Sequence, residues 1–378
     1  RGLGDVYKRQ DLNNDFRTQQ KPKGAKTYIN GMYKEQTVFD YEMNNDFLLR
    51  YTKKLNDFDL SASFGGNNMM QSYRSNTSLA ESLVVDRDYR LSNSVDRPKV
   101  TSIRRQKSIN SFYGLISASW RNMIFLDVTG RNDWESALAF SKYKSFFYPS
   151  VGLSVVLSQL IPNMPENLSY IKLRGSFASV GVAFERYIAN PLYSWNESGL
   201  SWNTQTQYPA YHLKPERTKS FEVGLTMRFL KHFNLDFTYY NSHTSNQTFD
   251  PQISGGTGFS KIIIQSGNVR NQGIELALGY RNTWRDFTWD TNYTLSTNQN
   301  KIISLANNVI NYATGERFSI DRLNMGGLGD AQFLLQEGGT LGDLYSRRDL
   351  RYDENNAIYI DENGNVATET IQDVNKYV

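Results

Sequence analysis

Three histidines are the residues of this sequence best suited to bind a metal ion or to transfer a proton near neutral pH. His212, His232 and His243 are the only histidines, and the chain has no cysteine. A zinc site needs several such ligands at close, defined spacing. We expect these three in a loop, a turn and the end of a strand, and we therefore predict isolated polar histidines and no metal site.

Two glycine-containing segments resemble ligand-binding loops without meeting their spacing. Residues 255–261, GGTGFSK, lack the G-x-x-x-x-G-K-[ST] pattern of a phosphate loop and precede no helical pattern. Residues 361–365, DENGN, resemble the start of a calcium loop, but the closing glutamate is not at the required position and no helix is predicted on either side. We predict a tight loop at the first and a hairpin turn at the second, with calcium as the alternative there, and no cofactor.

Four carboxylates alternate with apolar residues along predicted strands: Glu222, Asp236, Glu275 and Asp290. In a glycosidase two such carboxylates would act as acid and base. A carboxylate on the water-facing side of a strand needs no catalytic role. We therefore predict no catalytic residue and a protein that is not an enzyme.

Five aromatic residues in one polar loop form the candidate binding site. Residues 191–211 interleave them with Asn, Gln, Ser and Thr, and they are Tyr193, Trp195, Trp202, Tyr208 and Tyr211. This mixture stacks on apolar ring faces while its polar groups hydrogen-bond hydroxyls, as a sugar requires. The alternative is that the aromatic side chains pack the loop against itself.

The elements that must position these residues are predicted from residues 221–240, FEVGLTMRFLKHFNLDFTYY. Apolar residues occupy every second position on both sides of 230–232, so two strands form a hairpin with one apolar and one polar face. A soluble sheet that covers a core has this pattern, and so does a membrane barrel with lipid outside and water inside.

Composition narrows the choice between these classes. The mean hydropathy is −0.57, and the longest apolar runs have four residues, so no helix is expected to span a membrane. Barrel strands alternate and are compatible with such values, and the 24 Tyr and 21 Phe suit a barrel with aromatic girdles. The net charge is +4 with both signs interspersed, which does not indicate nucleic-acid binding.

The lengths of the connections between the predicted strands favour the membrane barrel over the soluble sheet. About ten strands fall into five hairpins, namely 47–53 with 57–64, 109–120 with 123–132, 146–157 with 170–180, 221–229 with 233–240, and 273–281 with 287–295. Turns within hairpins are short, and connections between hairpins are long, with polar loops expected at 67–107, 181–217 and 242–270. Because neighbouring antiparallel strands run in opposite directions, alternate connections lie at opposite ends of the sheet. The short turns therefore lie at one rim and the long loops at the other, as in outer-membrane barrels.

The alternation also predicts which residues face lipid. On the hairpin at 221–240 and on the next one they are Phe221, Val223, Leu225, Leu235, Phe237, Ile274 and Leu276. On the hairpin at 109–132 they are Tyr113, Leu115, Ile124, Leu126 and Val128.

We divide the chain into three segments of one architecture. Residues 1–45 are a polar segment whose first ten residues, RGLGDVYKRQ, have no periodicity and could be non-native. Residues 46–300 hold the barrel strands. Residues 301–378 are a region of glycine-rich turns and loops of the same barrel. The chain has no initiator Met, so we expect that its beginning is missing.

Five segments in order resemble the SusC/RagA family of TonB-dependent outer-membrane transporters. They are FYPSVGLSVVLS (147–158), IKLRGSFASVG (171–181), LKPERTKSFEVGL (213–225), SGNVRNQGIELALGY (266–280) and FLLQEGGTLGDLY (333–345). The resemblance covers most of the chain. It implies part of a 22-stranded plugged barrel that takes up glycans or peptides, with a SusD-like lipoprotein over its mouth and a TonB-contacting segment before the plug.

The sequence therefore predicts an all-β protein, an antiparallel transmembrane β-barrel present as an incomplete, curved open sheet with long loops at one rim. The resemblance implies import of oligosaccharides or peptides in the outer membrane, with a SusD-like lipoprotein, the TonB complex and outer-membrane lipid as partners. It adds contact with the lipoprotein as a third role for the aromatic loop. The alternatives are a passive porin, a surface adhesin barrel and a soluble carbohydrate-binding β-sandwich.

Overall fold

The computed structural model describes residues 2–182, 184–189, 192–196, 201–208, 210, 212–249, 258–259, 262–311, 315–328 and 330–376. The chain forms two compact units. The first comprises Arg1–Ser117, Thr129–Phe147 and Phe184–Ala189, and the second comprises Ala118–Val128, Tyr148–Ala183 and Asn190–Val378.

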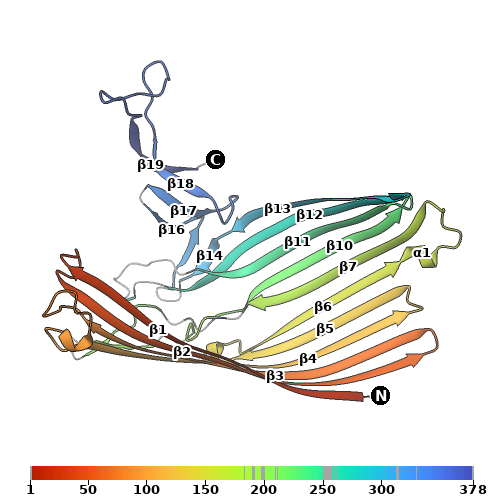
Figure 1. The fold of residues 1–378 in the computed structure, drawn as a ribbon, viewed down its shortest axis with the longest axis horizontal. Helices are drawn as coiled ribbons and strands as arrows, with labels where there is room; N and C mark the ends of the chain where they lie inside the picture. Colours follow the sequence, from red (N-terminus) through yellow and green to blue (C-terminus); the bar gives the residue numbers. More distant parts are fainter. Residues whose placement is uncertain are drawn as a thin grey trace. The chain divides into compact units, whose positions relative to one another are not determined.

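Antiparallel strands make up most of the described chain (Figure 1). The long strands are β1 (Gly2–Lys23), β2 (Asn30–Leu55), β3 (Phe58–Ala80), β4 (Lys99–Trp120), β5 (Ile124–Glu135), β6 (Ser145–Val156), β7 (Leu168–Val182), β10 (Glu216–Phe229), β11 (Phe233–Phe249), β12 (Ile264–Trp284) and β13 (Phe287–Ser304). The short strands are β8 (Ser194–Asn196), β9 (Ser201–Asn203), β14 (Ala306–Ile310), β15 (Arg317–Ile320), β16 (Arg322–Leu328), β17 (Ala331–Gln336), β18 (Leu344–Leu350) and β19 (Thr368–Lys376). The helical segments are η1 (Leu91–Asn93), η2 (Ser136–Leu138) and α1 (Leu157–Leu160).

The long strands form one open sheet. Its order is β1-β2-β3-β4-β5-β6-β7-β10-β11-β12-β13, so among the described residues β1 and β13 are its two ends and do not pair with each other. This confirms the predicted open antiparallel sheet, with eleven strands where about ten were expected. None of the helices in the described ranges is long and apolar enough to cross a membrane.

Aromatic rings line one face of the first unit. The ring of Phe64 stacks on that of Phe112 at 6.0 Å and lies 6.0 Å from that of Phe47, and Phe112 meets Trp134 edge-on at 6.1 Å. Gly66 makes room for this cluster, because a Cβ there would lie 2.4 Å from the Phe47 ring. Phe47, Phe64, Phe112 and Trp134 are called the outer aromatic cluster below.

The second unit shows the predicted apolar face. Leu225 of β10 is opposite Leu173 of β7 and Phe237 of β11, and Phe237 is in turn opposite Leu276 of β12. Because side chains alternate along each strand, this register places all seven residues predicted for this face on one side of the sheet. Figure 1 shows β10 to β13 running side by side.

The opposite face of the second unit carries a polar network around Arg174. Its guanidinium donates to both carboxylate oxygens of Asp236, at 2.9 and 3.2 Å, and to the hydroxyls of Thr226 and Thr238 at 2.9 and 2.6 Å. The side chain crosses over β10 at Gly224, where a Cβ would lie 2.4 Å from Arg174 Nε. A glycine therefore permits this contact between strands that are not neighbours.

A small apolar core lies beside the ends of β12 and β13 in the second unit. Its buried members are Ile262, Val269, Ile302, Leu305, Ala306 and Leu335. The turn after β17 is fixed to this core, since Ile302 N donates to Gly339 O and Gly338 N donates to Ile302 O, at 2.9 and 2.8 Å. Residues 301–378 were predicted to be glycine-rich turns and loops. Part of this region instead forms the short strands β14 to β19.

Two predicted loops are shorter than expected. The prediction of a polar loop over 67–107 is wrong, because β3 continues to Ala80 and β4 begins at Lys99, and likewise β11 continues to Phe249 and β12 begins at Ile264. The N-terminal region also contains β1 and most of β2, which pair from Gly2 opposite Tyr51 to Lys23 opposite Asn30. These strand ends carry polar side chains on both faces, so their sequences lose the alternation on which the prediction depended.

The facing predicted for two residues of β4 is wrong. Tyr113 and Leu115 line a pocket with the polar residues Asp46 and Asn67, whereas Phe112 belongs to the outer aromatic cluster. In β4 both alternating sets contain apolar side chains, so the periodicity of this strand alone could not identify the outward set.

Candidate functional site

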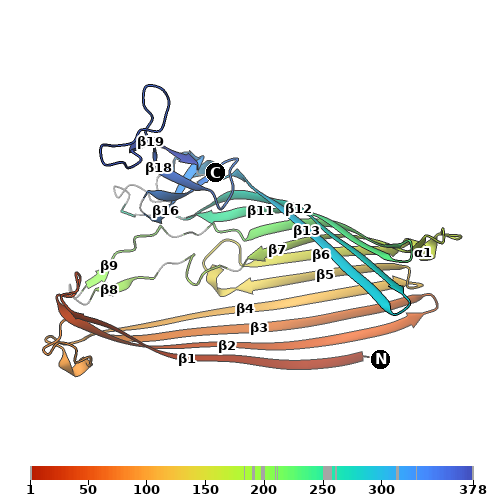
Figure 2. The same ribbon diagram turned by 45° about the horizontal axis from the view of Figure 1, so that its top comes forward.

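The aromatic loop contains a short hairpin that presents two tryptophans. Strands β8 and β9 pair with Trp195 directly opposite Trp202. Their rings meet edge-on at 5.3 Å and 72°, a geometry that aromatic pairs favour. Both side chains remain accessible, with exposed fractions of 47 and 66 %. Figure 2 labels β8 and β9 as a short pair of strands.

The other predicted aromatic residues of this loop separate into different environments. Tyr193 precedes β8 and is 62 % exposed. Tyr208 packs edge-on against Phe259 at 5.1 Å and contacts the apolar core beside β12. Tyr211 lies outside the described residues. Tyr208 thus takes the self-packing role, while Tyr193, Trp195 and Trp202 form the accessible part of the predicted site.

A buried ion pair holds the start of this connection. Lys107 of β4 and Glu135 at the end of β5 form an ion pair with side chains 8 and 5 % exposed. Lys107 Nζ donates to Phe184 O at 2.6 Å, and Phe184 N donates to Glu135 Oε1 at 3.1 Å. The charged pair therefore satisfies both backbone groups of a buried residue outside regular structure, as buried polar groups require. We call this arrangement the Phe184 clamp.

Further contacts hold the same segment of the first unit. The Tyr187 hydroxyl accepts a hydrogen bond from Gln106 N at 3.0 Å, and the Arg186 guanidinium donates to the Gln71 side chain at 3.4 Å. Ala189 is completely buried. Residues 184–189 are therefore a fixed strap between β7 and β8, a feature for which the sequence contains no periodic signal.

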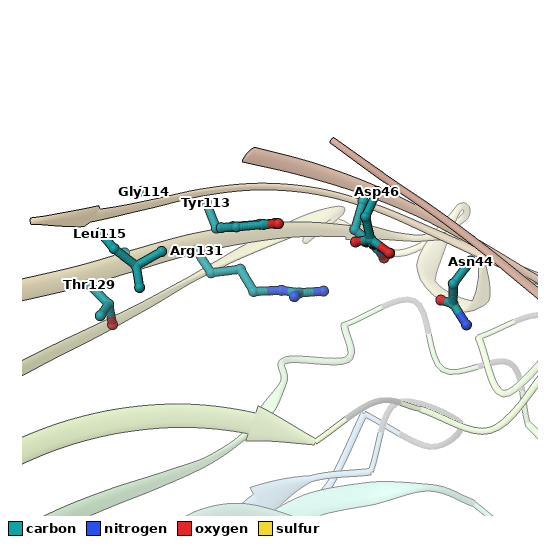
Figure 3. A pocket seen from close by; sticks show the side chains of 9 residues that line it. Asn44, Asp46, Tyr113, Gly114, Leu115, Thr129 and Arg131 are labelled. Carbon is teal, nitrogen blue, oxygen red and sulfur yellow. Dashed lines mark hydrogen bonds between the residues drawn. The ribbon is translucent and has the colours of Figure 1, made fainter. Parts of the chain in front are cut away.

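An open pocket lies on the polar face of the first unit (Figure 3). Its volume is about 520 Å³, and it is lined by Asn44, Asp46, Asn67, Tyr113, Gly114, Leu115, Thr129, Gly130 and Arg131. In Figure 3 the side chains of Tyr113 and Arg131 extend toward Asp46 on one side of the strands.

Hydrogen bonds fix the charged groups of this pocket. Asn67 donates to Asp46 at 2.7 Å, and the Arg131 guanidinium donates to Asp133 at 2.6 Å and to Ser111 at 2.8 Å. The same guanidinium lies 6.0 Å from the centre of the Tyr113 ring. A carboxylate, a guanidinium, amides and an aromatic ring thus converge, which suits hydrogen bonding to a polar ligand. This pocket was not predicted, because the alternation in β4 was interpreted with Tyr113 on the opposite face.

The predicted histidines lie apart from one another. His232 is in the turn after β10, where its Nδ1 lies 3.2 Å from Arg281 O. His212 lines a separate cavity of about 140 Å³ with Lys214 and Gln265. His243 belongs to β11, opposite Lys219. Within the described ranges no three potential ligands come together as a metal site.

The segment at 361–365 forms the predicted hairpin turn. Asp361 Oδ1 accepts hydrogen bonds from Asn363 N and Asn365 N at 2.9 and 2.8 Å, and Gly364 has a φ of +81°. These backbone donors, that of Asn365 first, lower the pKa of Asp361 from its usual value. The carboxylate is therefore engaged in shaping the turn. Most of the glycine segment 255–261 lies outside the described residues.

The four strand carboxylates lie on the polar face as predicted. Asp236 is bound by Arg174, and Asp290 forms a 3.9 Å ion pair with Arg281. By strand register Glu222 and Glu275 occupy the same face. Asp236 and Asp290 are thus held by cations on their own face.

Comparison with known proteins relates the whole described chain to one family. A family model described as "TonB dependent receptor-like, beta-barrel" matches residues 2–377. TonB-dependent receptor P39 of Formosa agariphila is 25 % identical over 372 residues, which cover 94 % of this chain and 33 % of that protein. TonB-dependent receptor SusC of Bacteroides thetaiotaomicron is 24 % identical over 286 residues, which cover 71 % and 28 %.

A solved structure of the RagAB peptide transporter has a similar fold. The TM-score is 0.76 at 16 % identity, and the match covers all of this chain and 42 % of that chain. This chain thus spans about a third of the length of the curated relatives it matches.

Proposed function

Because the chain belongs to the TonB-dependent receptor-like β-barrel family and is an outer-membrane protein, we propose that it is part of the barrel of an active transporter. The observation that carries this proposal is the family match over an antiparallel sheet whose two end strands are unpaired with each other in the described structure. Additional strands are needed to close such a sheet, because open edges cannot stay unpaired in hydrocarbon.

The proposed cargo is an oligosaccharide or a peptide. Support comes from the structural similarity to a peptide transporter, and from a pocket on the polar face that offers a carboxylate, a guanidinium, amides and an aromatic ring. Both substrate classes present many hydrogen-bonding groups along an extended chain. We further propose that the protein moves its cargo without chemical change and is not an enzyme.

The proposed partners follow from the family. A SusD-like surface lipoprotein would close the mouth, and the TonB complex would supply energy through a region N-terminal to this part of the barrel. The observation that supports a surface partner or ligand is the exposed pair of Trp195 and Trp202, which are residues that dominate binding energy where they become buried at an interface.

The transport proposal is tested by uptake in cells. Full-length protein in cells with an intact TonB system should accumulate labelled oligosaccharide or peptide, and deletion of TonB should abolish that accumulation while leaving the protein in the outer membrane. Uptake that persists without TonB would instead identify a passive porin, and surface attachment without uptake would identify an adhesin. A soluble β-sandwich is inconsistent with membership of this family.

The role proposed for the tryptophan hairpin is tested by Trp195→Ala/Trp202→Ala in the full-length transporter with its lipoprotein. Loss of cargo binding with an intact complex supports a ligand site, and loss of the complex supports a contact with the lipoprotein. Tyr208→Ala is the control for self-packing, because Tyr208 contacts the loop's own core. Unchanged binding, assembly and uptake in the double variant would contradict both roles.

A further inference from the structure

A small cavity lies beside the start of β10 in the second unit. Its volume is about 140 Å³. Its wall includes Lys214, two residues before β10, Asn246 near the end of β11 and Gln265 near the start of β12. All three lie at the strand ends away from the short turn at 230–232. In an outer-membrane barrel the end opposite the short turns faces the outside, which is the side from which a cargo arrives.

One side of this cavity is aliphatic. Four side chains form it, namely Leu213, Ile263, Val309 and Ile310. Leu213 is buried, and the other three are half-buried. An apolar cavity of about 150 Å³ binds one benzene-sized group, so the volume suits a single branched or aromatic side chain. A sugar ring would leave hydroxyl groups without partners against this wall, which is unfavourable.

The other side of the cavity is polar and positively charged. Lys214 and His212 line it, and both residues are exposed. Among the described residues that line the cavity there is no carboxylate. An ammonium group forms its strongest hydrogen bonds with anionic oxygens such as those of a carboxylate. A ligand that carries an apolar side chain next to a carboxylate would therefore match both sides.

Side-chain amides hold the wall of the cavity in place. The Gln265 side chain accepts a hydrogen bond from Lys214 N and donates one to Lys214 O, both at 2.6 Å. The Asn246 side chain donates to Pro215 O at 3.3 Å. Val309 packs against the apolar core beside β12 and β13. The cavity is thus preformed, and a preformed site loses less conformational entropy when a ligand binds.

We propose that this cavity binds the C-terminal residue of a peptide, with an aliphatic side chain against Val309 and Ile310 and the carboxylate at Lys214. The inference rests on the proposed import function and narrows its cargo to peptides, because a neutral oligosaccharide offers neither an aliphatic side chain nor a carboxylate. Binding at equilibrium requires no energy from TonB. The failure of this site and the failure of the transport proposal are therefore distinguishable.

The test is calorimetric titration of the full-length protein in detergent with the tripeptide glycyl-glycyl-leucine. Triglycine lacks the side chain, glycyl-glycyl-leucine amide lacks the carboxylate, and maltotriose is the oligosaccharide. Ala210→Leu should fill the cavity, because Ala210 lines it. Its control is Thr204→Leu, at an exposed position of the same loop outside the cavity.

The charge is tested by a second pair of variants. Lys214→Gln removes the ammonium group from the cavity, and Lys219→Gln is its control, because Lys219 is an exposed lysine of β10 that does not line the cavity. An exposed ion pair contributes modestly, so Lys214→Gln should bind the leucine tripeptide about two- to fivefold more weakly. Its affinity should then equal that of the wild type for the amide.

The wild type should bind the leucine tripeptide about tenfold or more tightly than triglycine, because burial of a leucine side chain contributes at least that much. Ala210→Leu should abolish this difference, and Thr204→Leu should retain it. Equal affinities for the two tripeptides in the wild type, including no binding of either, would overturn the proposal. So would tighter binding of maltotriose, or a leucine preference that persists in Ala210→Leu. If Ala210→Leu fails to fold, the wild-type comparison and Lys214→Gln still decide.

Discussion

At the scale of single residues, glycines determine which side chains can meet across the sheet. Arg174 reaches Asp236 only because Gly224 leaves the intervening strand bare. Gly66 accommodates the Phe47 ring on the apolar face of the first unit. In both places an absent side chain permits a contact between two others, so the glycine is part of the network that surrounds it.

The first prediction concerns Gly224. Gly224→Ala should break the hydrogen bonds of Arg174, because the new Cβ would lie 2.4 Å from Nε. Losing charge-assisted bonds should lower the free energy of unfolding of the full-length barrel by about 1–3 kcal/mol, measured by urea titration in detergent micelles. Gly152→Ala is the control, since nothing lies within 4 Å of its Cβ position. Equal stability of the two variants would contradict the role assigned to Gly224.

The second prediction tests the facing of the strands. Leu276 and Ala277 are neighbours on β12 that face opposite sides of the sheet, and Ala277 is opposite Asp236. Leu276→Arg should cost ~2–4 kcal/mol in the complete barrel, the cost of a cation at the middle of the lipid face. Ala277→Arg should be tolerated because it meets water and a carboxylate.

The measurement is the unfolding free energy of both variants in lipid vesicles. Similar costs at the two positions would show that the apolar face does not contact lipid. Thr226 would be a less suitable position for this control, because Thr226 donates to Asp236 at 2.7 Å and accepts from Arg174.

At the scale of elements, short strands and straps give the long connections fixed structure. The Phe184 clamp fixes the chain directly after β7, and the hairpin β8–β9 then presents its two tryptophans. The apolar core beside β12 and β13 similarly holds Tyr208. These connections are therefore positioned at several points by buried contacts of their own.

The third prediction concerns the Phe184 clamp. Glu135→Gln leaves Lys107 buried without its counter-charge, and breaking a buried pair in this way costs about 3–5 kcal/mol. The backbone amide of Phe184 should therefore exchange with deuterium at least tenfold faster in the full-length protein. Glu185→Gln is the control, because Glu185 is exposed and lies next to Phe184 in the strap. Unchanged exchange in Glu135→Gln would exclude the clamp as the element that holds the strap.

At the scale of the whole molecule, the open sheet is the dominant feature. Among the described residues, its end strands β1 and β13 each pair with one neighbouring strand of the sheet, so one edge of each lacks a strand partner. Open edges pair readily with other chains and cannot be satisfied in hydrocarbon. The 378 residues therefore need further strands before they can form a stable membrane-spanning structure.

The fourth prediction follows from these open edges. The 378-residue chain expressed alone should aggregate and should fail to form a heat-modifiable barrel in detergent, whereas the full-length protein should migrate as a compact species in unheated gels. Co-expression with the missing strands should restore the compact species. A compact, heat-modifiable species from the isolated chain would contradict the assignment of β1 and β13 as open edges.

The sequence alone determined the class of the fold and the positions of several strands and turns. Residues 221–240 predicted two strands with the correct faces, because the aliphatic and Phe side chains on both sides of the turn fall in one alternating set. The turns predicted at 121–122 and 230–232 lie where the structure has them, at residues with left-handed backbone that are not glycine. The five resembling segments identified the family that the comparisons support.

Only the tertiary structure decided the features that depend on the register between strands, namely the facing of side chains in β4, the Phe184 clamp and the pocket on the polar face. Alternation within β4 could not show whether Phe112 or Tyr113 faces outward, because both sets contain apolar residues, and only the contacts with neighbouring strands resolved it. The Phe184 clamp joins residues 77 positions apart, and the pocket on the polar face draws on four strands. A period of two is local information, whereas these sites are set by which distant strand lies alongside and at which residue it starts.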